Sequence, residues 1–193
     1  MVETGKRETT FKEGGTYEDL LALPEHVTGQ ILDGLLVAEP RPAYGHQVAA
    51  TALDRILAPV FHLGGTVGGW RLTCEVEVHL KRNVLVPDLA GWRVDRHPAP
   101  AALSDPFVAV APDWVCEVLS PSTGALDRTR KMRIYAREGV DHVWLVNPVD
   151  RTLEVYRREG SRWLLLDSFA GEERVRAEPF ETLELDLGAL WRG

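Results

Sequence analysis

Residues 114–123 read Trp-Val-Cys-Glu-Val-Leu-Ser-Pro-Ser-Thr, and this stretch decides how the chain folds. Its apolar run contains one charge, Glu117, and predicts a strand in the centre of a sheet, because such strands are apolar on both faces. The Ser-Pro-Ser-Thr end favours a turn and supplies a cap for a following helix. That helix is predicted over 125–138, and Gly139 suits the left-handed position that ends it.

Other patterns lie on both sides of this stretch. Asp33-Gly34 between two apolar runs is a strong hairpin signal, because a type I′ turn needs positive φ at both central residues. Apolar residues recur at helical spacing over 46–61. Strands are predicted over 71–80, 84–92, 142–147, 152–157 and 162–167. Because helices and strands do not alternate regularly, we expect an α/β fold with a central mixed β-sheet flanked by helices, an N-terminal hairpin and C-terminal strands.

The composition is that of an ordinary folded protein. The 193 residues are 45% hydrophobic and 26% charged, and the length is typical of one domain. We expect a flexible tail over residues 1–15, which are polar and rich in glycine, and one domain over 16–193. Cys74 and Cys116 are too few for a disulfide scaffold or a four-cysteine zinc site, and both lie in apolar stretches. We expect both to be buried, reduced thiols.

The net charge of −7 argues against a protein that coats nucleic acid non-specifically, since such proteins carry a basic excess. Any contact with DNA must then use a local patch or a metal ion. No stretch approaches the roughly 18 apolar residues that span a membrane, and the polar N-terminus lacks the apolar run of a signal peptide. We therefore expect a cytoplasmic protein without a membrane partner.

Two carboxylates stand where a charge is costly. Glu117 lies inside the apolar run of the predicted central strand, and Asp88 follows the apolar residues 84–87. A buried carboxylate costs several kcal/mol unless it is paired or bound to a cation. If the two strands are neighbours, the carboxylates converge and suit Mg²⁺ or Mn²⁺. The alternative is that Pro87-Asp88 is a chance pair and Glu117 faces outward on an edge strand.

The predicted helix after Glu117 carries a polar stripe. Asp127, Lys131 and Tyr135 follow one another at intervals of four residues and share a face that can lean over the same cleft. Lys131 is then placed to orient an attacking water or to offset phosphate charge. The alternative is a surface ion pair between Asp127 and Lys131. The same helix has a net charge of about +4 over 126–137, which suits either phosphate contacts or a solvated face.

These residues together resemble the Uma-two family of restriction endonucleases, which belongs to the PD-(D/E)XK nuclease superfamily. The resemblance covers roughly residues 16–160. It rests on Ile31–Gly34, His46, Pro87-Asp88, the block Glu117–Thr123, Asp127, Lys131, Tyr135, Gly139-Val140 and Trp144. It implies a restriction-endonuclease-like core and Mg²⁺-dependent (or Mn²⁺-dependent) hydrolysis of phosphodiester bonds.

By this resemblance Asp88 and Glu117 are the metal ligands and, with Lys131, the catalytic residues. Lys131 takes the place of the lysine that usually follows the glutamate by two positions, where this chain has Leu119. Gln30 stands where the family often has a glutamate.

Gln30, His46, Asp127 and Tyr135 are expected to contact the substrate, with Gln30 and His46 at the mouth of the same cleft.

The leading hypothesis is a metal-dependent endonuclease that hydrolyses DNA. The alternative is a non-catalytic DNA-binding or protein-interaction module that keeps the nuclease fold. A nuclease that cuts both strands commonly uses two active sites, so a homodimer is one expectation. The sequence lacks the Gly-x-Ser-x-Gly pattern of serine hydrolases and the glycine pattern of a P-loop. These absences argue against a serine hydrolase and a P-loop enzyme, and both hypotheses above are compatible with them.

Overall fold

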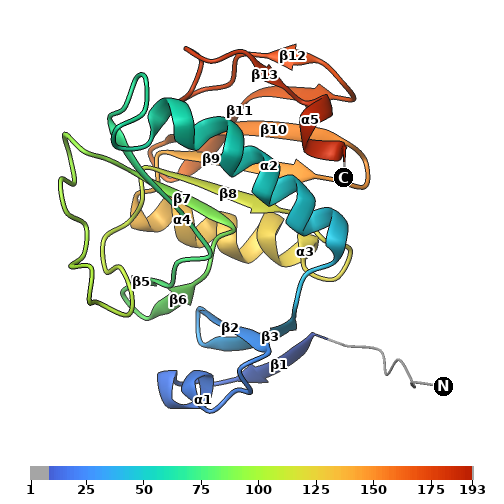
Figure 1. Ribbon diagram of the computed structural model, residues 1–193. Helices are drawn as coiled ribbons and strands as arrows, with labels where there is room; N and C mark the ends of the chain where they lie inside the picture. Colours follow the sequence, from blue (N-terminus) through green and yellow to red (C-terminus); the bar gives the residue numbers. More distant parts are fainter. Residues whose placement is uncertain (1–8, 193) are drawn as a thin grey trace.

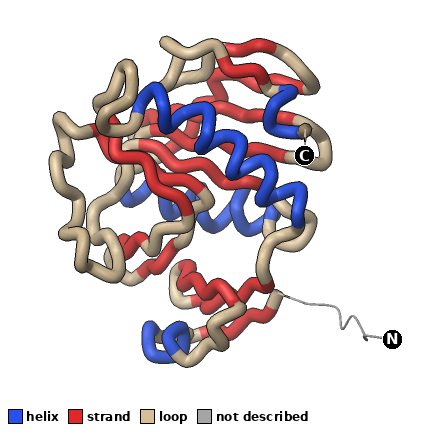
Figure 2. The backbone as a smooth tube through the Cα atoms, viewed as in Figure 1, coloured by secondary structure: helices blue, strands red, loops and turns tan. Residues whose placement is uncertain are grey.

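A computed structural model of the chain describes residues 9–192, and a six-stranded sheet runs through its centre (Figures 1 and 2). The strand order is β11-β10-β9-β8-β7-β4. Strands β8 and β9 are parallel, and all other neighbours are antiparallel. The strands are β4 (Trp70–Cys74), β7 (Leu89–Arg93), β8 (Trp114–Val118), β9 (His142–Asn147), β10 (Thr152–Glu159) and β11 (Arg162–Ala170). The expected mixed central sheet is confirmed.

A second sheet of five strands lies beside the first, in the order β1-β3-β2-β6-β5. Its strands are β1 (Thr10–Glu13), β2 (Val27–Leu32), β3 (Leu35–Pro40), β5 (Val78–Leu80) and β6 (Asn83–Leu85), and the short helix α1 (Tyr17–Leu21) packs against it. The predicted hairpin is β2–β3, and its turn residues Asp33 and Gly34 have the positive φ values of 52° and 83° that a type I′ turn needs.

Helices cover both faces of the central sheet (Figure 1). Helix α2 (Tyr44–Phe61) packs on one face through Ala49, Leu53, Leu57 and Phe61. The opposite face is covered by one continuous helical segment made of α3 (Gly124–Leu126), a π-helical turn η1 (Asp127–Lys131) and α4 (Met132–Glu138). The chain ends with β12 (Arg174–Val175), β13 (Leu185–Asp186) and α5 (Gly188–Trp191), which pack on the α2 side. No helix within residues 9–192 combines the length and apolar character needed to cross a membrane.

Two predicted strands are each broken in two, and the halves belong to different sheets. The run 71–80 divides at Glu75, whose φ of 48° turns the chain, so β4 stays in the central sheet and β5 joins the second one. The run 84–92 divides at Pro87, which cannot donate to a ladder and separates β6 from β7. The two breaks lie side by side, because Glu75 N–H donates to Asp88 C=O at 3.1 Å.

Two further expectations need correction. Thr10–Glu13, expected in the flexible tail over 1–15, form β1 and pair with Leu35–Ala38 of β3, because the exposed edge of the hairpin offers unpaired backbone groups. Residues 1–8 of that tail lie outside the described part of the chain. Cys116 is buried as expected, but Cys74 is exposed because it ends β4 directly before the turn at Glu75.

Candidate active site

Asp88 and Glu117 face each other at the end of the β7–β8 pair. Leu89 pairs with Cys116 in the antiparallel register, so the next position along the strands sets Asp88 opposite Glu117. Val118 N–H donates to Asp88 Oδ2 at 2.6 Å and fixes this carboxylate at the strand end. The central sheet therefore brings together two acids that are 29 residues apart in sequence, on the side that the segment α3–η1–α4 covers.

Glu117 is enclosed by the helix that follows it. Only 2% of the residue is exposed, Lys131 Nζ donates to Oε2 at 2.9 Å, and the Tyr135 hydroxyl donates to Oε1. Burial raises the pKa of Glu117 to about 8, although the nearby Lys131 ammonium acts in the opposite direction. These contacts overturn the alternative of an outward-facing glutamate on an edge strand, because β8 lies inside the sheet.

Lys131 lies between two carboxylates. Its Nζ is 3.1 Å from Asp127 Oδ1 as well as 2.9 Å from Glu117 Oε2, and only 4% of the residue is exposed. Burial lowers the pKa of Lys131, but Asp127 and Glu117 together raise it well above its usual value. The alternative of an exposed surface pair is therefore wrong. Leu119, two positions after Glu117, is buried in the core.

The π-helical turn η1 includes both Asp127 and Lys131. Met132 N–H bonds to Asp127 C=O five residues back, so the helix is locally wider than an α-helix. Such turns are frequent at functional sites, where they change the direction of a side chain. The four-residue spacing predicted that Asp127, Lys131 and Tyr135 share a face, but no feature of the sequence indicated the π turn.

His46 and Gln30 reach the same place from other elements. His46, in the first turn of α2, has its Nε2 2.7 Å from Asp88 Oδ1. Burial lowers the pKa of His46, but the hydrogen bond that His46 donates to Asp88 and the negative charges of Asp88 and Asp127 together outweigh burial, so the pKa is raised. Gln30, on β2, is buried and its Oε1 accepts from Val86 N–H at 3.0 Å, which holds the backbone just before Asp88.

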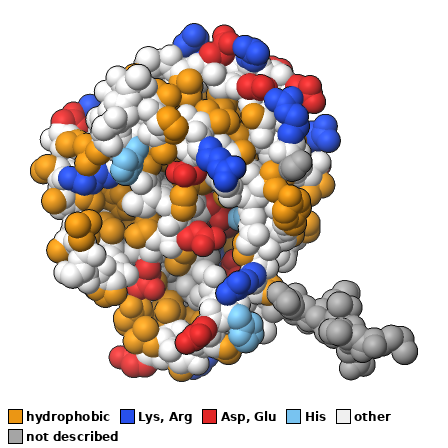
Figure 3. Space-filling view, in the orientation of Figure 1, with side chains coloured by type: hydrophobic (Ala, Val, Ile, Leu, Met, Phe, Trp, Pro, Cys, Tyr) orange, Lys and Arg blue, Asp and Glu red, His pale blue; other side chains and the backbone are white. Residues whose placement is uncertain are grey.

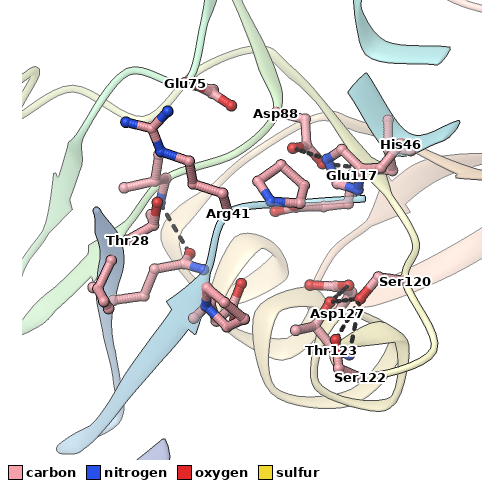
Figure 4. Close-up of a pocket in the computed structure, with 18 of the residues that line it drawn as sticks. Thr28, Arg41, His46, Glu75, Asp88, Glu117, Ser120, Ser122, Thr123 and Asp127 are labelled. Atoms are coloured by element: carbon pink, nitrogen blue, oxygen red, sulfur yellow. Dashed lines mark hydrogen bonds and ion pairs between the residues drawn. The ribbon is translucent and has the colours of Figure 1, made fainter. Parts of the chain in front are cut away.

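Of the predicted site residues, all but Tyr135 line one cleft of about 710 Å³: Gln30, His46, Asp88, Glu117, Asp127 and Lys131. The floor of this cleft consists of Asp88, Glu117, Asp127 and Lys131. Figure 4 shows Asp88, Glu117 and His46 gathered on one side of the pocket and Ser120, Ser122, Thr123 and Asp127 on another. Acidic side chains gather in the hollowed middle of this face of the molecule (Figure 3).

Sequence reasoning missed two parts of the cleft. Glu39, on β3, lines it with a buried Oε1 that has no hydrogen-bond partner among the described residues, and burial raises its pKa. The rule that found Glu117, a charge inside an apolar run, also fits Glu39 after Leu35–Ala38. The second part is a hydroxyl cluster in which Ser120 Oγ is 2.9 Å from Ser122 Oγ and 2.8 Å from Thr123 Oγ1.

The basic helix is largely neutralised by acids of the protein itself. Arg128 makes a bidentate pair with Glu154, with contacts of 2.6 and 3.0 Å, and Arg137 pairs with Asp33 at 2.8 Å. With Lys131 buried, only Arg130 and Arg133 of the five basic residues over 126–137 have no ion pair among the described residues. The helix therefore offers far less charge to phosphate than its sequence indicates.

The donor set suits a divalent metal ion that keeps water in its coordination shell. No three His, Cys, Asp or Glu side chains within residues 9–192 converge closely enough to enclose a metal ion. Mg²⁺ is commonly held by only one or two carboxylates, with water and substrate phosphate as the other ligands. Facing Asp88 and Glu117 supply such a pair, and Asp127 and Glu39 add further carboxyl oxygens to the lining of the same cleft.

The fold is that of a class of mixed α/β proteins with a solved representative. The chain resembles a crystal structure described as "a putative nuclease belonging to DUF820 from Anabaena variabilis ATCC 29413", with a TM-score of 0.69 and 21% sequence identity. The likeness covers 92% of this chain and 97% of that one, and at this identity it establishes the fold.

The family follows from the sequence. Residues 16–188 match the Uma2 family, which is described as "Putative restriction endonuclease", and the chain belongs to this family. A comparison with curated proteins gave no match. The family and the fold that the sequence resemblance implied are both confirmed.

Proposed function

We propose that this protein is a metal-dependent endonuclease that hydrolyses phosphodiester bonds in DNA. The observation that carries the proposal is the facing pair of Asp88 and Glu117 on the cleft floor, with Lys131 Nζ 2.9 Å from Glu117. Two carboxylates and one lysine around a cleft supply ligands for a divalent ion and a positive group for the phosphate. Membership of a family described as "Putative restriction endonuclease" supports DNA as the substrate.

The chain's own residues divide the work by their positions. Asp88 and Glu117 would hold Mg²⁺ or Mn²⁺, which when bound polarises the phosphodiester and lowers the pKa of a water. Lys131 keeps a positive charge beside the site where phosphate charge develops in the transition state. Asp127 keeps that ammonium in place, and Tyr135 fixes the second oxygen of Glu117. His46 orients Asp88 through Oδ1, while Val118 N–H holds Oδ2.

The alternative is a DNA-binding or protein-interaction module that has kept the fold without catalysis. Two observations favour it. Among the described residues no three-ligand metal group is formed, and all four oxygens of Asp88 and Glu117 already accept hydrogen bonds within the protein. The two functions differ in one testable respect, because only the nuclease requires a metal ion to change its substrate covalently.

Cleavage of DNA without ends tests the proposal. A supercoiled plasmid and a circular single strand are incubated with the protein in Mn²⁺ or Mg²⁺, and again in EDTA. We expect cleavage only with metal and its loss in Asp88→Asn. The matched control is Asp105→Asn, because Asp105 is an exposed aspartate outside the cleft and should be dispensable. Absence of cleavage of both circles under every metal condition would favour the non-catalytic module.

A further inference from the structure

We propose that the cleft takes a DNA strand that is unpaired at the point of cleavage, in preference to continuous duplex. The inference rests on the proposed function and names its substrate class. Four features of the cleft carry it: the depth of the reactive groups, an apolar wall beside them, a mouth rich in acids, and one arginine at that mouth without a partner among the described residues. The mouth, in contrast to the floor, is lined by Leu21, Glu25, Arg41, Glu75 and Glu77.

The reactive groups lie buried at the bottom of the cleft. Glu117, Asp127 and Lys131 are each exposed by no more than 4%, and the cleft above them is about 710 Å³. One side is formed by helix α1 and the start of β2, and the other by the Ser120–Thr123 turn. A phosphate must pass between these walls to reach Asp88 and Glu117. A single flexible strand can bend into such a space, whereas a duplex is held rigid by its second strand.

The wall from α1 to β2 is mainly apolar where it meets the cleft. Its apolar residues are Leu20, Leu21, Leu23, Pro24 and Val27, and Glu25 is its one charged residue. Leu21 is 65% exposed, although burial of a large aliphatic side chain away from water is favourable. An unpaired base presents an apolar face that can pack on such a wall. In a duplex the faces of the bases are already stacked, so this wall would have no partner.

The charge around the cleft mouth opposes a duplex. Besides the acids of the floor, Glu25, Glu75 and Glu77 line the cleft. Duplex DNA carries one negative charge per roughly 1.7 Å of its length, and one strand carries half that density. A protein that holds duplex by its phosphates needs a track of cations, and two of the four arginines of the basic helix, Arg128 and Arg137, are paired with acids. A single strand therefore brings fewer phosphates to the acidic mouth and is repelled less than a duplex.

One cation at the mouth is free to hold a phosphate. Of the lining cations, Lys131 is paired with two acids and His46 with Asp88, while Arg41 makes no hydrogen bond or ion pair with any described residue. Arg41 lies between Pro40 and Pro42, which restrict its backbone. Figure 4 shows its side chain extending along the pocket toward the side of Glu75. One guanidinium on a stiff segment suits one phosphate of a single strand.

Binding of a labelled single strand, and of the same strand annealed to its complement, tests the proposal by fluorescence anisotropy in Ca²⁺ at fixed salt. We expect the single strand to bind at least about tenfold more tightly than the duplex. Leu21→Ser and Arg41→Gln should each weaken binding of the single strand about threefold to tenfold. The matched controls are Leu103→Ser and Arg133→Gln, exposed residues outside the cleft, and these should bind as the parent does.

Equal or tighter binding of the duplex would overturn the inference, as would cleft variants that bind like their controls, or no binding of either DNA. Cleavage of both DNAs in Mn²⁺ separates this inference from the proposed function. Preferred binding of the single strand without any cleavage would sustain the substrate class and refute the nuclease. Faster cleavage of the duplex would sustain the nuclease and refute the substrate class.

Discussion

The floor of the cleft and its mouth are built in opposite ways. On the floor, Lys131 contacts Glu117 and Asp127 at 2.9 and 3.1 Å, and all three side chains are almost fully buried. At the mouth, Leu21 and Arg41 are exposed, and Arg41 has no polar partner among the described residues. The side chains of the floor are held in place by contacts with one another in the free protein. Arg41 at the mouth lacks such contacts and, with the exposed Leu21, is available to bind a substrate.

This difference separates two kinds of effect. A substitution on the floor leaves a buried charge without its partner, so it changes the free energy of unfolding as well as the chemistry. A substitution at the mouth removes nothing that the folded chain needs, so it changes only the binding of substrate. Each region can therefore be tested with a pair of measurements, unfolding by urea and single-turnover cleavage of DNA.

Asp88 and Glu117 should give the largest effect. Asp88→Asn and Glu117→Gln keep the shape of each side chain but remove the negative charge that a divalent ion needs. We expect each variant to lose at least about 10³-fold in cleavage rate, because metal binding and the activation of water fail together. Single-turnover rates at saturating Mn²⁺ measure this. A rate within a few fold of the parent for either variant would remove that carboxylate from the mechanism.

Replacement of Lys131 should give the second largest loss of cleavage rate and the largest loss of stability. Lys131→Met keeps the length of the side chain but leaves Glu117 and Asp127 buried without their cation, so we expect a loss of about 3–5 kcal/mol in the free energy of unfolding. Where the variant remains folded, cleavage should fall by about 10²-fold. Lys131→Arg should rescue poorly, since a planar guanidinium does not fit the space of an ammonium. Parental rates in folded Lys131→Met would show that the lysine is only structural.

Tyr135 should give an intermediate result. Tyr135→Phe removes the hydroxyl that donates to Glu117 and leaves a buried carboxylate oxygen short of one donor, which should cost about 1–3 kcal/mol. The control is Tyr156→Phe, because Tyr156 donates to Glu154 in a less buried place. Urea unfolding measures the free energy of unfolding of both variants, and we expect the larger loss in Tyr135→Phe. An equal loss of stability in the two variants would contradict a special role for the contact with Glu117.

The mouth should give the smallest effect on stability. Arg41→Gln should leave the free energy of unfolding within about 0.5 kcal/mol of the parent, since the side chain is exposed and unbonded. Its effect should be confined to binding, so the Michaelis constant should rise while the turnover number stays nearly unchanged. A large loss of stability in this variant would mean that the floor and the mouth do not differ in the way described.

The sequence predicted what depends on short stretches of chain. The apolar run around Glu117 indicated a central strand, and the spacing of Asp127, Lys131 and Tyr135 indicated a shared face, because helix and strand periods are local properties. Pairing between strands is not local. The division of residues 71–80 between two sheets depends on a turn at Glu75 that an uninterrupted alternation of apolar residues conceals.

The same limit explains the parts of the site that went unnoticed. Glu39 enters the cleft because β3 pairs with β2 and lies near the floor, which requires the arrangement of both sheets. The pairing of Arg128 with Glu154 joins residues on a helix and on β10, so a count of charges along one helix overstated its free charge. The facing of Asp88 and Glu117 was predicted only on the condition that their strands are neighbours, and the β7–β8 register meets it.

Binding of Mn²⁺ measured by titration calorimetry tests the central claim most directly. The claim is that Asp88 and Glu117 hold one divalent ion between them on the cleft floor. We predict a single site in the parent protein and a loss of at least about tenfold in affinity in the double variant Asp88→Asn, Glu117→Gln, with the fold checked by circular dichroism. An unchanged affinity for Mn²⁺ in the folded double variant would contradict the account.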